Sequence, residues 1–142
     1  MNNDLHDFEQ FMKQREEASR AFLNGEIGPL ESIATQVSPA TIFGPNGNYV
    51  EGADKVNAAN ASGAKMFESG GESSFEILQM AANDGIAYWA GIQWATARMK
   101  GKTEGVPFNL RVTEVFRREG HEWKLIHRHA DALAPKPEDK KK

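Results

Sequence analysis

The sequence contains no cysteine and no long apolar run in its 142 residues. The lack of cysteine excludes disulfide bonds, thiolate chemistry, and zinc or iron–sulfur sites held by cysteine. No segment approaches the roughly 20 apolar residues needed to span a bilayer. The first residues also lack the basic start and apolar stretch of a signal peptide. We therefore expect a cytoplasmic protein that makes no membrane contact.

An excess of basic residues is also missing. Lysine and arginine total 17 against 20 aspartate and glutamate residues, with both signs interspersed and a formal net charge of −3. A nucleic-acid-binding domain usually presents a basic face, so we expect no nucleic-acid partner. The sequence has no phosphate-binding loop, no dinucleotide fingerprint and no nucleophile elbow. We expect no cofactor.

The length suits one domain with a single core. Apolar residues between 5 and 22 recur at steps of three and four, which predicts a long amphipathic helix, and Pro29 suits the first turn of a short second helix. Asn46-Gly47 then separates two short β-prone runs, as in a hairpin. The remaining expected elements are a helix at 53–69 and strands at 73–82, 86–99, 107–118 and 122–132.

Helices followed by consecutive strands with short connections indicate the α+β class, with an antiparallel sheet covered on one side by helices. The expected domain covers residues 1–133. The last residues, APKPEDKKK at 134–142, are polar and contain proline, so we expect a disordered tail.

Alternation in the last predicted strand separates two sets of side chains. Lys124 and Arg128 on one face are long cations, so we expect the other face to turn toward the helices. That inward set consists of Trp123, Leu125, His127, His129 and Asp131.

The preceding strand allows two interpretations. The face with Phe108, Leu110, Val112 and Phe116 is apolar except for Glu114, so it could form the core and leave Arg111 in solvent. Alternatively, that apolar face could form a dimer interface, and Arg111 and Thr113 would then point inward with the histidines. Composition does not choose between these interpretations.

The stretch LRVTEVFRREGHEWKLIHRHAD at 110–131 resembles the closing hairpin of SnoaL-like proteins, a branch of the nuclear transport factor 2-like superfamily that includes ketosteroid isomerase-like proteins. The matching positions are Arg111, Thr113, Arg117, Gly120, Trp123, His127 and His129. The resemblance implies a cone-like, strongly curved antiparallel sheet around a long N-terminal helix and two further helices. It also implies a pocket between sheet and helices, and a homodimer that pairs through the outer face of the sheet.

The candidate catalytic residues are His127, His129 and Asp131. A histidine titrates near neutral pH and suits proton transfer, although either histidine could instead pack without chemistry. A metal would need a third ligand, and neither His6 nor His121 is well placed to supply it, so we expect no metal site.

The candidate ligand-pocket residues are Arg111, Thr113, Tyr88, Trp94 and Trp123. The planar fork of Arg111 could hold a carboxylate or enolate oxygen, or it could form a structural salt bridge, for example with Asp131. Tyr88 and Trp94 share a strand face and could supply an apolar pocket wall.

Three functions follow as hypotheses. The first is a pocket protein that binds a small apolar or carboxylated molecule. The second is an isomerase, cyclase or dehydratase that uses a histidine for proton transfer and Arg111 to stabilise an oxyanion. The third is an association module that serves oligomerisation.

Overall fold

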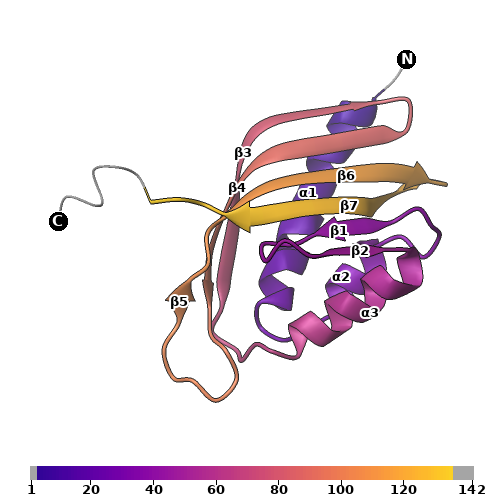
Figure 1. The fold of residues 1–142 in the computed structure, drawn as a ribbon. Helices are drawn as coiled ribbons and strands as arrows, with labels where there is room; N and C mark the ends of the chain where they lie inside the picture. Colours follow the sequence, from indigo (N-terminus) through magenta and orange to yellow (C-terminus); the bar gives the residue numbers. More distant parts are fainter. Residues whose placement is uncertain (1–2, 136–142) are drawn as a thin grey trace.

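The computed structural model describes residues 3–135, so the expected tail lies outside the described residues from residue 136 onward. The described chain forms three helices and seven strands (Figure 1). In chain order these are α1 (Asp4–Phe22), α2 (Gly28–Ile33), β1 (Thr41–Phe43), β2 (Tyr49–Glu51), α3 (Ala53–Ala64), β3 (Glu72–Asn83), β4 (Ile86–Ala97), β5 (Val106–Pro107), β6 (Leu110–Glu119) and β7 (Glu122–Ala132).

One sheet contains all seven strands, in the order β2-β1-β7-β6-β4-β3, with β5 paired to β4. Every pairing is antiparallel except that of β1 with β7, so the sheet is mixed. Figure 1 shows the long strands bending across α1, while α2 and α3 lie together near β1 and β2. The predicted α+β class and the curved sheet around the first helix are confirmed, with a parallel pair that the sequence did not predict.

The first helix attaches to the sheet through one apolar stripe. Phe8, Met12 and Ala18 lie at helical spacing and are buried against the strands. The Phe8 ring contacts Phe116 and Trp123, with ring centroids 5.1 Å and 5.5 Å apart. This aromatic cluster fixes one end of α1 to the β6–β7 hairpin. Within residues 3–135, no helix is both long and apolar enough to cross a membrane.

Two irregularities in strand pairing bend the sheet. In β3 the register shifts between Ile77 and Gln79, opposite Gly91 of β4. A Cβ atom at Gly91 would lie 2.0 Å from the Glu76 carbonyl oxygen, so only glycine allows this approach. In β7 the register shifts at Ile126, because Phe116 pairs with Leu125 whereas Val115 pairs with His127. Such bulges increase local twist and curvature.

Candidate functional site

The bulge at Ile126 decides which side chains of β7 face the helices. An extra residue in one strand reverses the alternation beyond it. Trp123 and Leu125 are buried under the helices, but the next inward residues are Arg128 and Ala130. The prediction that His127, His129 and Asp131 share the inward face with Trp123 and Leu125 is therefore wrong, since these three lie beyond the bulge and face outward.

The outer face of the sheet also carries Arg111 and Thr113. Their neighbours Leu110, Val112, Glu114 and Phe116 are buried, so the interpretation with Arg111 outside the core is the one the structure supports. Arg111 Nε and Nη2 donate to the Asp131 carboxylate at 2.7 Å and 2.9 Å, although the Arg111 side chain is 63% exposed. These hydrogen bonds lower the pKa of Asp131. Arg111 forms the salt bridge that was one of its two predicted roles.

The remaining predicted pocket residues divide between the two faces. Tyr88 Oη donates to Gln79 at 2.6 Å and Trp94 Nε1 donates to Glu76 at 2.9 Å, both on the outer face. Trp123 is in the aromatic core beside Phe8, and its Nε1 has no hydrogen-bond partner within the described residues. The structure thus gathers Arg111, Thr113, His129 and Asp131 around a hollow on the outer face, and separates Trp123 from them.

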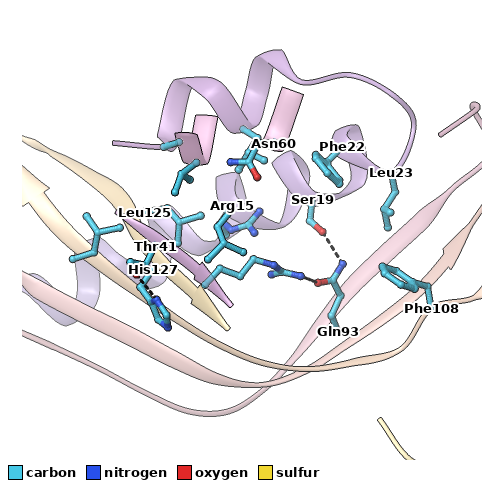
Figure 2. Close-up of a pocket in the computed structure, with 16 residues that line it drawn as sticks. Arg15, Ser19, Phe22, Leu23, Thr41, Asn60, Gln93, Phe108, Leu125 and His127 are labelled. Carbon is cyan, nitrogen blue, oxygen red and sulfur yellow. Dashed lines mark hydrogen bonds between the residues drawn. The ribbon is translucent and has the colours of Figure 1, made fainter. Parts of the chain in front are cut away.

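A cavity of about 80 Å³ lies between the inner face of the sheet and the helices (Figure 2). Its apolar wall includes Phe22, Leu23, Leu30, Ile42, Val56, Phe108 and Leu125. Its polar lining includes Arg15 and Ser19 from α1, Asn60 from α3, Gln93 from β4 and Arg128 from β7. The helices and the strands thus supply an apolar pocket with a few convergent polar groups, the usual composition of a ligand site.

Glu114 does not line the cavity itself but binds the two arginines at its polar end. Its side chain is 0% exposed. Arg15 donates from Nε at 2.9 Å and from Nη2 at 2.7 Å, Arg128 Nη1 donates at 2.8 Å, and Trp89 Nε1 donates at 2.9 Å. Oε1 therefore accepts from Arg15 and Trp89, and Oε2 accepts from Arg15 and Arg128, so that each oxygen of this buried charge has two donors.

The environment of Glu114 keeps it ionised. Burial alone would raise its pKa, but the positive charges and hydrogen bonds of Arg15 and Arg128 outweigh burial and lower the pKa from 4.5 to about 2. A carboxylate with this pKa accepts no proton near neutral pH. Glu114 is therefore a fixed counter-charge for two arginines and is unsuited to act as a general base.

Gln93 extends the network toward α1. Its Oε1 accepts from Arg128 Nη2 at 2.7 Å, and its Nε2 donates to the hydroxyls of Ser19 and Ser73 at 3.1 Å and 3.2 Å. Because both ends of the amide have partners, its orientation is determined. Figure 2 shows Ser19 and Gln93 pointing toward one another across the cavity.

His127 also borders this cavity, although its imidazole ring points away from the cavity (Figure 2). Its Nδ1 lies 2.7 Å from the Thr41 hydroxyl, and Phe43 packs edge-on against its ring on the outer face. Burial and the nearby His129 lower its pKa, which favours the neutral imidazole. Within residues 3–135, no group of three or more histidine, aspartate or glutamate side chains is arranged to hold a metal ion.

Sequence reasoning missed Arg15, Gln93, Glu114 and Arg128 as members of one site. Two of them did carry a signal of burial in the sequence. Arg15 lies on the apolar stripe of α1, and Glu114 lies on the apolar face of β6. A charged residue on an otherwise buried face needs a partner. Arg128 gave no such signal, because the uninterrupted alternation of β7 placed it outside.

The family model of the SnoaL-like domain, which is built from sequences, matches residues 10–135 of this chain. The chain belongs to the SnoaL-like family. No curated protein matches the chain.

Three solved structures are similar to this SnoaL-like protein. A candidate dehydratase of the NTF2-like family from Streptomyces avermitilis has a TM-score of 0.77 and 18% identity over 94% of this chain and 100% of its own. An NTF2-like superfamily protein from Salmonella enterica has a TM-score of 0.75 and 10% identity, with coverage of 92% and 91%. The association domain of C. elegans CaMKII has a TM-score of 0.67 and 12% identity, with coverage of 93% and 100%. At these identities the likeness establishes the fold alone.

Proposed function

We propose that this SnoaL-like protein binds a small molecule in the cavity between α1, α3 and the sheet. The observation that carries the proposal is the division of the cavity into an apolar wall and a polar end whose groups are already ordered by Glu114 and Gln93. Preordered polar groups reduce the entropy lost when a ligand is bound.

Ligand binding has more support than enzymatic proton transfer. A proton-transfer enzyme needs a titratable group at the reacting atom. Glu114 is held ionised behind two arginines, and Arg111 and His129 are on the other face of the sheet. Proton transfer by His127, and a catalytic part for His129 and Asp131, stay predictions. Their test is loss of turnover on substitution, once a substrate is known.

The cavity is tested by closing it. Asn60 on α3 lines the cavity and is half-buried, so Asn60→Trp should fill the space without disturbing the core. We expect small aliphatic probes, including acids and amides, to bind the native protein in NMR titrations. The variant should lose at least about tenfold in affinity, which corresponds to about 1.4 kcal/mol.

Ala58→Trp is the matched control. Ala58 is exposed on the same helix, so this substitution adds the same side chain outside the cavity. It should bind the probes like the native protein. Absence of binding by every probe, or equal binding by both tryptophan variants, would contradict the proposal.

A second candidate function is self-association through the outer face of the sheet, as the association-domain fold relatives suggest. This face exposes Leu78 and Trp94, and it also carries Ile92 and Tyr88. Large apolar side chains exposed together on one face often mark a protein interface. We propose that two copies pair on this face to form a homodimer.

The dimer is tested by adding charge at an exposed apolar residue of this face. Leu78 is 65% exposed, so Leu78→Lys should leave the fold intact and shift the native dimer to monomer in sedimentation equilibrium. Val37→Lys adds the same charge at another exposed apolar position and should leave the mass unchanged. A native protein that sediments as a monomer at concentrations of tens of micromolar would rule out a stable dimer.

A further inference from the structure

The interior cavity has an imbalance of charge. Its charged lining residues are Arg15 and Arg128, and no aspartate or glutamate within residues 3–135 borders it. Glu114, behind the lining, supplies one negative charge to two arginines. The polar end therefore carries one positive charge in excess. In a partly buried site, where the effective dielectric constant is lower than in water, such a charge attracts an anion more strongly than it would at the surface.

Arg128 is positioned to contact that anion. Arginine has five N–H donors in a planar fork. Within the described residues, Arg128 uses one of these donors to bind Glu114 and a second to bind Gln93. The Arg128 side chain is 21% exposed, while that of Arg15 is 4% exposed. Because Glu114 and Gln93 hold the guanidinium at two points, its remaining donors have a fixed orientation at the cavity.

We propose that the ligand of this cavity is a small monocarboxylate, whose carboxylate accepts hydrogen bonds from Arg128 and whose apolar part packs against Phe22, Leu30 and Val56. This inference rests on the proposed binding function and names its ligand class. A planar carboxylate matches the guanidinium fork. A single excess charge favours a monoanion over a dianion, whose second charge would be buried without a partner.

The size of the cavity limits the ligand. Its volume of about 80 Å³ is smaller than the volume of about 150 Å³ of an engineered protein cavity that holds benzene. A carboxylate with a short aliphatic chain fits this space, and a longer chain would have to extend out of it. Butyrate is therefore a suitable probe, with butyramide as its neutral equivalent of nearly the same shape.

The test compares butyrate, butyramide and the dianion succinate by NMR titration of the full chain. The side-chain amide signals of Asn60 and Gln93 report binding in the cavity, because both residues line it. We expect butyrate to bind at least about tenfold more tightly than either butyramide or succinate. Arg128→Gln should remove this preference, so that butyrate and butyramide bind with equal affinity.

Lys55→Gln is the matched control, because it removes one positive charge from an exposed position on α3. It should retain the full preference for butyrate. If Arg128→Gln fails to fold, the comparison of the three probes on the native protein decides the inference by itself.

The outcomes separate the inference from the proposed function. Equal affinity for butyrate and butyramide would overturn the monocarboxylate assignment and leave the binding cavity in place. Tighter binding of succinate than of butyrate would overturn the argument from a single excess charge. Failure of all three probes to shift the Asn60 and Gln93 signals would count against both the ligand class and the cavity.

Discussion

Replacing Glu114 by glutamine is expected to lower the free energy of unfolding by about 3–5 kcal/mol at neutral pH, the usual loss when one partner of a buried ion pair is removed. Glutamine keeps the shape of the side chain but leaves Arg15 and Arg128 in the core without a counter-charge. The substitution also removes one hydrogen-bond acceptor. The NH2 group of the glutamine amide can only donate, whereas the carboxylate oxygen that it replaces accepted from Trp89 or an arginine. Chemical denaturation followed by circular dichroism measures the change.

Glu76→Gln is the matched control, because Glu76 is exposed in the middle of β3 and glutamine can still accept from Trp94. Its free energy of unfolding should change by no more than about 0.5 kcal/mol. Equal effects of the two substitutions would contradict the role assigned to Glu114.

Acid supplies a second measure of the same interaction. The pKa of Glu114 is lowered from 4.5 to about 2 in the folded protein. A carboxyl group with a depressed folded pKa contributes stability above its unfolded pKa and loses that contribution as pH falls toward its folded pKa. The difference in stability between the native protein and Glu114→Gln should therefore be constant above about pH 4.5 and shrink between pH 4.5 and 2. A difference that stays constant through this range would show that the charge of Glu114 is not what stabilises the fold.

Phe8→Ala is expected to lower the free energy of unfolding by a similar amount, about 3–5 kcal/mol, through the cavity it leaves. Phe8 is 0% exposed and contacts Phe11, Phe116 and Trp123. These contacts hold α1 against the β6–β7 hairpin, so the substitution also loosens the elements that bring Arg15 to Glu114 and Arg128. Thermal and chemical unfolding of the variant measure the loss.

Leu5→Ala tests the same helix at an exposed position, since Leu5 is 43% exposed. We expect a change of no more than about 0.5 kcal/mol. A loss below about 1 kcal/mol for Phe8→Ala would mean that the aromatic cluster does not anchor α1.

The ion-pair network connects stability with ligand binding. Arg128 holds Glu114 and Gln93 on one side and borders the cavity on the other. A ligand anion at Arg128 would add a second counter-charge to the two arginines. Ligand binding to the folded state raises the apparent stability by mass action, so a carboxylate should also raise the melting temperature of the native protein.

Much of the fold followed from local patterns in the sequence. The apolar spacing that includes Phe8 predicted α1, and the expected strand at 86–99 corresponds to β4 at Ile86–Ala97. Resemblance in the last hairpin indicated the family that the domain match confirmed. These features depend on helical and strand periodicity and on short turns, which neighbouring residues determine.

The site itself was decided by tertiary structure. Strict alternation placed His127, His129 and Asp131 inside and Arg128 outside, and the bulge at Ile126 reversed that arrangement. A bulge depends on how two strands pair, so the order of residues within one strand does not reveal it. The sequence determined which elements form and which family they build. Strand pairing, with its bulge in β7, and the packing of α1 on the sheet together decided that Arg15, Glu114 and Arg128, far apart in the chain, meet at one buried point.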